Sequence, residues 1–442
     1  MSFTAKTQVE HAVRWRYWVR RIAWFEPFWV LAVGALLLLP ARFLPMTLQP
    51  YTFAYRPFGV ALLVLGWPIR VIVYREFTCY TPLDLPLFFL LLWLPVNYWA
   101  SSDKALSWEA ISYLVFGIAL YLALLNWPPA QRCPQLIGWL ILLLGIGLAV
   151  LMPLLGELTT RKLLFVPVVD HLSQRASALL PGNVNVNRVA GTLVLILPLP
   201  VALAVRRDWR MRRLPTALNA LVAVLMLVAL IFTQSRSAYL AAAVSIAIIL
   251  VLRWQKLLYS VPVILLIGVV ITVVIGPRVV LEALSVGGVL GGLDVRLELW
   301  SRALYAIGDF AFTGIGIGTF ERVIPVLYPF FLIGPAIRIT HAHNLLLQVS
   351  LDLGLPGLVA YLALFINTFA LLAIALRQRE SALNWALAAG ALGGLTAMFV
   401  HGIFDAAVWG CKPAFVSWLL IALSVQVGLR ATARSLAINA PL

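Results

Sequence analysis

Long apolar runs constrain the fold of this chain more than any other feature of its sequence. A helix that crosses a bilayer needs about 20 apolar residues, and about twelve stretches of that kind follow one another here. They lie near 23–41, 57–74, 83–100, 108–127, 135–156, 188–205, 215–234, 237–254, 258–276, 344–376, 382–404 and 412–429. Charged residues make up only 11% of the chain, against about 25% in soluble domains. The sequence therefore predicts an all-α polytopic membrane protein.

The placement of the basic residues predicts the orientation of these spans. Basic clusters precede the first span and follow several even-numbered ones. They are Arg14, Arg16, Arg20 and Arg21, the run 206–213, Arg253 and Lys256, Arg377 and Arg379, and Arg430 and Arg434. Because basic residues favour the cytoplasmic side of short loops, both termini are expected to be cytoplasmic. This placement accounts for most of the net charge of +16, so no nucleic acid partner is expected.

This orientation leaves two long segments outside, at about 157–187 and 277–343. In the second segment, apolar residues recur at the spacing of one face of a helix. They are Leu293, Leu297, Trp300, Leu304 and Ile307. Such a stripe predicts an amphipathic helix that lies on the membrane surface or roofs a cavity. We therefore expect a single transmembrane domain over residues 1–442, with an outer helical cap built from the two segments.

Arginines on the outer side call for an explanation, because basic residues are disfavoured there. The outer arginines are Arg188, Arg236, Arg296 and Arg302. Glu298 lies four residues before Arg302, which predicts an ordinary helix ion pair. Arg296 and Arg302 are separated by about 120° around a helix, so they are not expected to aim at one point. Arg188, Arg236 and Arg296 either extend to lipid phosphates or bind an anionic substrate presented from the membrane.

Two histidines stand where the longer outer segment meets the tenth span. The free N–H groups at a helix start suit a phosphate, and an imidazole can accept a proton near neutral pH. Since residues two apart point in nearly opposite directions on a helix, only one of His341 and His343 is expected to be central. His343 is preferred because it begins a His-Asn-x9-Gly-x-x-Gly run, in which Asn344 can cap the helix or orient the ring. Gly354 and Gly357 are predicted to let a neighbouring helix pack closely.

No motif for a metal or cofactor is evident in the sequence. His401 and Asp405 lie four residues apart at the outer end of the eleventh span, and we interpret them as a structural pair because no third ligand is evident. Three cysteines without a CxxC spacing predict no disulfide framework. The Gly-rich stretch 312–321 does not follow a strand, which argues against a phosphate loop. A lipid-linked phosphate or pyrophosphate is the expected ligand.

The ordered set of motifs between about residues 180 and 410 resembles the O-antigen ligase and O-antigen polymerase superfamily of bacterial inner membranes. The motifs are NVNVNRVAG (183–191), TQSRSAYLA (233–241), RLELW (296–300) with the following GIGIGTFE, the run from His343, and HGIFD (401–405). The resemblance implies a GT-C-like membrane fold whose active site faces the periplasm. It also implies transfer of a glycan from undecaprenyl pyrophosphate, without metal or nucleotide, to the lipid A–core oligosaccharide in the ligases.

The resemblance implies essential roles for Arg236, Arg296 and His343. The arginines would neutralise the pyrophosphate leaving group, and His343 would act as general base in a transfer that inverts the anomeric centre. We further predict that substrate is bound by Arg188, Asn344, His341 and Arg302.

Three alternatives remain open from the sequence. A polymerase would use another lipid-linked repeat as acceptor, and a protein O-oligosaccharyltransferase would use a protein hydroxyl. A transporter of lipid-linked glycans belongs to a different class. Transporters usually show paired repeats and polar residues near the midplane, whereas the polar residues here crowd the outer face, which favours an enzyme.

Overall fold

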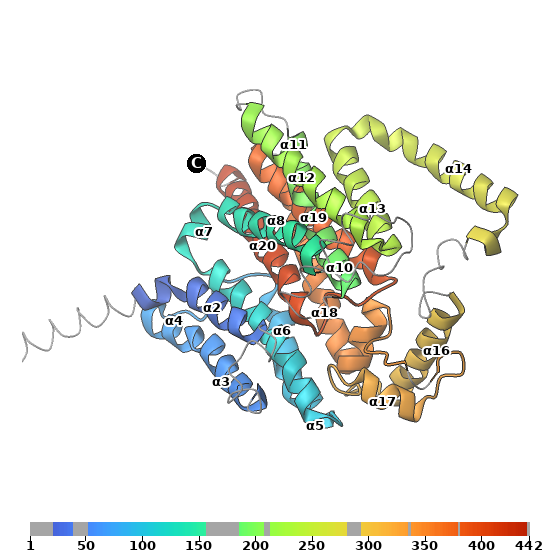
Figure 1. Ribbon diagram of the computed structural model, residues 1–442. Helices are drawn as coiled ribbons and strands as arrows, with labels where there is room; N and C mark the ends of the chain where they lie inside the picture. The colour runs from blue at the N-terminus through green and yellow to red at the C-terminus, as the bar shows by residue number, and fades with distance from the viewer. Residues whose placement is uncertain are drawn as a thin grey trace, which may run out of the picture.

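A computed structural model shows a helical bundle with a smaller group of helices at one end (Figure 1). The structure describes residues 21–38, 52–155, 185–206, 213–280, 293–334, 337–378 and 381–439. Within these ranges no strand occurs, and nine helices have the length and composition to cross a membrane. Shorter apolar helices at Glu26–Leu38, Asp84–Ala100 and Gln135–Leu151 occupy three further predicted spans. The prediction of an all-α polytopic membrane protein is confirmed.

The α-helices follow the predicted spans closely. In chain order they are α2 (Glu26–Leu38), α3 (Thr52–Val64), α4 (Gly66–Tyr74), α5 (Asp84–Ala100), α6 (Lys104–Leu125), α7 (Pro128–Arg132), α8 (Gln135–Leu155), α10 (Val186–Ile196), α11 (Pro198–Val205), α12 (Arg213–Thr233), α13 (Arg236–Arg253), α14 (Ser260–Ile275), α16 (Leu293–Asp309), α17 (Phe320–Leu327), α18 (Leu345–Gln378), α19 (Ala382–Gly402) and α20 (Phe415–Asn439). Most of the shorter outer segment predicted at 157–187 lies outside the described residues, as do Arg14, Arg16 and Arg20.

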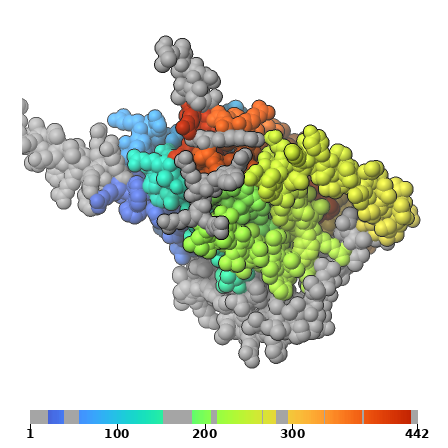
Figure 2. Space-filling model, turned by 90° about the horizontal axis from the view of Figure 1, so that it is seen from above, coloured from blue at the N-terminus to red at the C-terminus, as the bar shows by residue number. Residues whose placement is uncertain are grey.

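The centre of the bundle is formed by α6, α18, α19 and α20. A helix that is apolar on all sides is expected to be buried, and every residue of α6 from Ala110 to Leu125 is buried. α20 packs against α6, α18 and α19. In contrast, α14 has no buried residue in its apolar stretch and extends away from the bundle in both views (Figures 1 and 2). The central helices are therefore the ones that can hold a site in place.

Two of the outer arginines lie at the same end of the bundle because their helices run in the same direction. Arg253 at the end of α13 donates from Nε to the carbonyl oxygen of Val205 at the end of α11, at 2.8 Å. α10 and α11 together span 20 residues and α13 spans 18, which correspond to similar lengths at 1.5 Å per residue. Arg188 in the first turn of α10 and Arg236 at the start of α13 therefore share one end.

α19 runs in the opposite direction and finishes at that same end. A Cβ on Gly390, near the start of α19, would lie 2.8 Å from the Cα of Leu199 in α11. A Cβ on Gly191, near the start of α10, would lie 3.1 Å from Cε1 of His401 in the last turn of α19. His401 is therefore placed beside the first turns of α10.

The longer outer segment folds into a cap with its own small core. This core contains Leu299, Ala303, Ala306, Ile315, Phe320, Ile324, Ile333, Ile339, Ala342 and Leu351. The amphipathic helix predicted in this segment is present as α16, but two members of its predicted stripe, Leu297 and Leu304, are 49% and 58% exposed. The small residues Ala303 and Ala306 are buried instead, because they allow close packing. Trp300 and Ile307 of the predicted stripe pack against this core, whereas Leu297 and Leu304 face away from it.

Glycines break α18 into two pieces. Gly354 has a φ of 69° and lies in the left-handed region, which only glycine adopts freely. A Cβ there would lie 2.2 Å from the carbonyl oxygen of Phe312, and one on Gly314 would lie 2.6 Å from the carbonyl oxygen of Asp352. The Gly-rich loop, rather than a neighbouring helix, therefore docks against this break, and the predicted helix packing at Gly354 was wrong. Residues 345–353 form a short first piece of α18, between its start and the break at Gly354.

Candidate active site

The turn before α18 brings both outer histidines together. Ala342 is fully buried in the cap core, and its N–H donates to Oε1 of Gln348 at 2.8 Å. His343 follows with a left-handed φ of 49°, which turns its ring back onto His341, with 4.2 Å between ring centroids. The prediction that only one histidine is central was wrong, because the tripeptide is not helical and α18 begins only at Leu345.

Asn344 caps the start of α18. Its Oδ1 accepts from the N–H of Leu347 at 3.1 Å, the usual geometry of a helix N-cap. Its Nδ2 donates to the carbonyl oxygen of Ile403 at 3.1 Å. The side chain thus joins the histidine turn to the segment that follows α19, while its binding of substrate remains a prediction.

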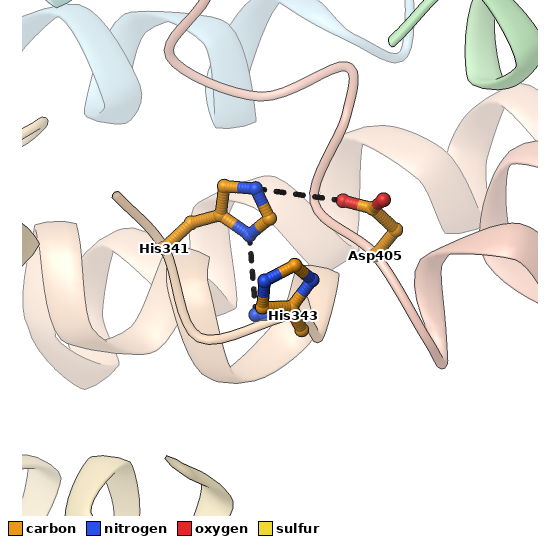
Figure 3. Close-up of side chains that lie close together, drawn as sticks. All are labelled: His341, His343 and Asp405. Atoms are coloured by element: carbon orange, nitrogen blue, oxygen red, sulfur yellow. Dashed lines mark hydrogen bonds and ion pairs between the residues drawn. The ribbon is translucent and has the colours of Figure 1, made fainter. Parts of the chain in front are cut away.

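Asp405 completes a cluster with the two histidines (Figure 3). α19 ends at Gly402, and the N–H of Asp405, just beyond it, donates to the carbonyl oxygen of His401 at 3.1 Å. Nε2 of His401 makes no hydrogen bond among the described residues, so their interpretation as a structural pair rests on this backbone bond. Oδ1 of Asp405 instead lies 3.6 Å from Nε2 of His341, is buried, and accepts no hydrogen bond from the described residues. Gly402, a typical helix-ending residue, was the available sequence signal.

His341 is held in one tautomer. Its Nδ1 accepts from the backbone N–H of His343 at 3.2 Å. Burial, together with the charges of Arg188 and His401, lowers the pKa of His341 to about 3, so the ring is neutral near pH 7. The single ring proton is then on Nε2, which faces Asp405.

The ring of His343 makes no hydrogen bond with the described residues. Burial, His341 and Arg296 lower the pKa of His343 to about 3, against the opposing charge of Asp405. The ring is neutral near pH 7, and the hydrogen bonds among the described residues leave both ring nitrogens of His343 unused. A neutral, half-buried imidazole with a free nitrogen can accept a proton from a bound hydroxyl.

Arg296 reaches the same cluster from α16. Its Cζ lies 5.5 Å from the ring centroid of Phe404, next to Asp405. Burial lowers the pKa of Arg296, and the charge of Asp405 raises it; a guanidinium stays charged at neutral pH. Its Nε is buried and donates to no acceptor among the described residues. Arg296 therefore brings unsatisfied donors to the edge of the histidine pair.

Residues 221–362 match the family model described as O-antigen ligase. This match supports membership of the O-antigen ligase superfamily. No curated protein matches the chain. The matched segment contains Arg236, Arg296 and His343, whereas Arg188 and Asp405 lie outside it. The tertiary structure, rather than the family match, adds Asp405 to the cluster.

Arg302 is turned away from the cluster, as its angular separation from Arg296 on the helix predicts. Its Nη2 lies 3.9 Å from Oε1 of Glu298, and its Nε donates to the carbonyl oxygen of Pro329 at 3.1 Å. Glu298 also accepts from the N–H of Phe331 at 2.6 Å. The structure thus places Arg302 where it holds the loop after α17 onto α16; binding of substrate by Arg302 remains a prediction.

The charge around the cluster bears on whether it binds a cation. The ligand atoms of His341, His343 and Asp405 lie within 4.8 Å of one another, and such a trio has the composition of a divalent metal site. However, Arg188 and Arg296 lie close enough to lower the pKa values of the two histidines. Two cations against one carboxylate favour an anion over a divalent cation.

Proposed function

We propose that this protein transfers a glycan from undecaprenyl pyrophosphate to the lipid A–core oligosaccharide at the periplasmic face of a bacterial inner membrane. One observation carries the proposal: the guanidinium of Arg296 lies 5.5 Å from the ring centroid of Phe404, the residue before Asp405, and the carboxylate of Asp405 lies within 4.8 Å of a ring nitrogen of His343. A cation for the leaving diphosphate and an acceptor for a proton therefore stand side by side. The match to the O-antigen ligase family model supports the same reaction.

In the proposed step, a hydroxyl oxygen of the acceptor forms a bond to the anomeric carbon of the donor sugar. The bond between that carbon and the pyrophosphate oxygen breaks, and its electron pair leaves with undecaprenyl pyrophosphate. The hydroxyl proton moves to His343. Arg296, with Arg236 and Arg188 at the same end of the bundle, neutralises the leaving group, which is the kind of preorganised charge that lowers a barrier most. Attack opposite the leaving group inverts the anomeric centre.

A reconstitution assay tests the function directly. Purified protein is mixed with lipid-linked glycan and rough lipopolysaccharide, and the products are separated on a gel. Glycan attached to lipopolysaccharide is expected. Longer lipid-linked chains made without lipopolysaccharide would indicate a polymerase. Glycan on an added protein acceptor would indicate a protein O-oligosaccharyltransferase. Movement of intact donor across a vesicle membrane without any covalent product would indicate a transporter.

We expect transfer to survive an excess of EDTA, because the arginines beside the cluster supply the positive charge that a metal would otherwise provide. The measurement is the transfer rate before and after chelation and dialysis. Loss of activity that magnesium, manganese or zinc restores would contradict this expectation. It would instead make His341, His343 and Asp405 the metal ligands.

The cap is expected to face the periplasm. Tyr305 on α16 is 62% exposed, so Tyr305→Cys should react with an impermeant thiol reagent in intact spheroplasts. Lys256→Cys, placed after the eighth span, should react only after lysis. The parent chain for both variants has Cys79, Cys133 and Cys411 replaced by serine. The reverse labelling pattern would invert the topology and remove a periplasmic substrate from consideration.

A further inference from the structure

A buried carboxylate lies behind the histidine turn, outside the set of residues that face substrate. Asp352 is 1% exposed and accepts hydrogen bonds from three directions. Its Oδ1 accepts from Nε2 of Gln348 at 2.9 Å and from the N–H of Gly318 at 3.3 Å, and its Oδ2 accepts from Nε1 of Trp409 at 2.8 Å. All three partners are donors, so both side-chain oxygens of Asp352 act as acceptors. A buried acceptor held in this way fixes the groups around it.

Gln348 connects this carboxylate to the histidines. Its side chain is 3% exposed. Its Nε2 is committed to Asp352, so its Oε1 is turned toward the N–H of Ala342, from which it accepts at 2.8 Å. If the side-chain amide of Gln348 were rotated by 180°, its Oε1 would face the acceptor oxygen of Asp352, where no hydrogen bond between them could form. Asp352 therefore sets the orientation of the Gln348 amide. Ala342, at the other end of this series of hydrogen bonds, lies between the two histidines.

Trp409 connects the same carboxylate to the other half of the cluster. It lies four residues after Asp405, in the segment between α19 and α20. The bond from its indole to Asp352 therefore anchors the segment that carries Asp405. The main chain at Asp352 is held as well, because Nδ2 of Asn97 in α5 donates to its carbonyl oxygen. One carboxylate thus ties down both segments that meet at the active centre.

We propose that Asp352 and Gln348 are positioning residues, which hold the His341–His343 turn and the Asp405 segment in register through Ala342 and Trp409. Neither contacts substrate. The left-handed backbone of His343 is a conformation that persists only where surrounding contacts enforce it, and the hydrogen bond to Ala342 is such a contact. The kinetic consequence rests on the function proposed above, whereas the placement of the ring does not.

Gln348→Met and Asp352→Asn test this arrangement, since both nearly keep the volume of the side chain and remove its specific hydrogen bonding. The matched control is Gln426→Met. Gln426 in α20 is also buried, at 4% exposure, and its Nε2 donates to the carbonyl oxygens of Leu124 and Leu125, with no link to the histidine turn. A loss of general packing should affect all three variants alike.

We expect Gln348→Met and Asp352→Asn to lower kcat by about 10- to 100-fold, as small displacements of reacting groups do, with the KM for the lipid-linked donor nearly unchanged. Gln426→Met should keep both constants. The kcat of the double variant Gln348→Met/Asp352→Asn should be no lower than that of the less active single variant, because the two side chains act through the same series of hydrogen bonds. The double variant Gln426→Met/Asp352→Asn should show only the loss of Asp352→Asn.

Acylation of His343 by diethyl pyrocarbonate, followed by peptide mass spectrometry, reports the turn without any transfer assay. A less restrained turn exposes its ring more often, so acylation should be at least about threefold faster in Gln348→Met and in Asp352→Asn, but not in Gln426→Met. Unchanged acylation in whichever of the two variants folds would overturn the proposal, even if kcat falls. Equal effects in Gln426→Met would also overturn it. If the unaltered protein shows no transfer, the proposed function fails and acylation alone decides this question.

Discussion

His343→Gly is expected to lower the rate of glycan transfer by about two to four orders of magnitude, the usual contribution of a general base. Glycine is the informative replacement because His343 has a left-handed φ of 49°, which alanine would adopt only with strain. Steady-state rates with purified components measure the effect. Free imidazole should restore part of the activity, since the missing ring leaves room at the same place.

His341→Gly provides the comparison. His341 accepts the N–H of His343 and faces Asp405, so its loss should weaken transfer less, and imidazole should not rescue it. If His343→Gly retains substantial turnover, the base lies elsewhere or departure of the pyrophosphate runs ahead of attack. A stronger loss in His341→Gly would exchange the two assignments.

The pH profile should depend on whether substrate is bound. In the free enzyme, burial, His341 and Arg296 lower the pKa of His343 to about 3 against the opposing charge of Asp405, and Arg188 and His401 act on the adjacent His341. The acid limb of kcat/KM should therefore lie well below pH 6.5, the ordinary value for histidine. A bound diphosphate adds negative charge and raises the pKa, so the acid limb of kcat should lie at higher pH. A limb of kcat/KM near 6.5 would contradict this expectation.

Arg296→Ala is expected to lower kcat/KM by about 10²- to 10³-fold, the usual loss when one preorganised contact to developing charge is removed. Arg296→Lys should restore little, because an ammonium lacks the planar pair of donors that engages two phosphate oxygens. Arg236→Ala should behave similarly. Arg322→Ala in α17 is the control within the cap: Arg322 is exposed and lies 3.5 Å from Asp103, and such surface pairs contribute little.

A second variant separates catalysis from simple charge pairing. Arg296 lies close to Asp405, and its removal leaves Arg188 as the remaining arginine near that buried carboxylate. If Arg296 served only to neutralise Asp405, the double variant Arg296→Ala/Asp405→Asn would recover activity. We expect it to stay inactive, because the diphosphate still lacks its cation. Recovery in the double variant would reassign Arg296 to a structural role.

Local patterns in the sequence were sufficient for the helices. Apolar runs long enough to span a bilayer are properties of a short window, and the helices of the structure follow them. The start of α18 was also readable, because Asn344 caps it through atoms only three residues away. The angular separation of Arg296 and Arg302 likewise followed from helix geometry alone, and the two side chains lie against Phe404 and Phe331.

The sequence was misleading where a backbone leaves the regular helix. His341 and His343 share one site because a left-handed residue folds the turn, and Gly354 receives a loop rather than a helix. A helical wheel cannot represent either case.

The sequence by itself determined which segments become helices, how α18 begins, and which polar residues occur in the outer motifs, since each of these depends on neighbours within a few residues. Only the tertiary structure decided that Asp405 meets His341, and that Asp352 ties Gln348 to Trp409. Those partners are 64, 4 and 57 residues apart in the chain, and the two long separations are closed by the packing of α18 with α19 and α20. Contacts of that kind depend on helix direction and on where each helix ends, which no single stretch of sequence specifies.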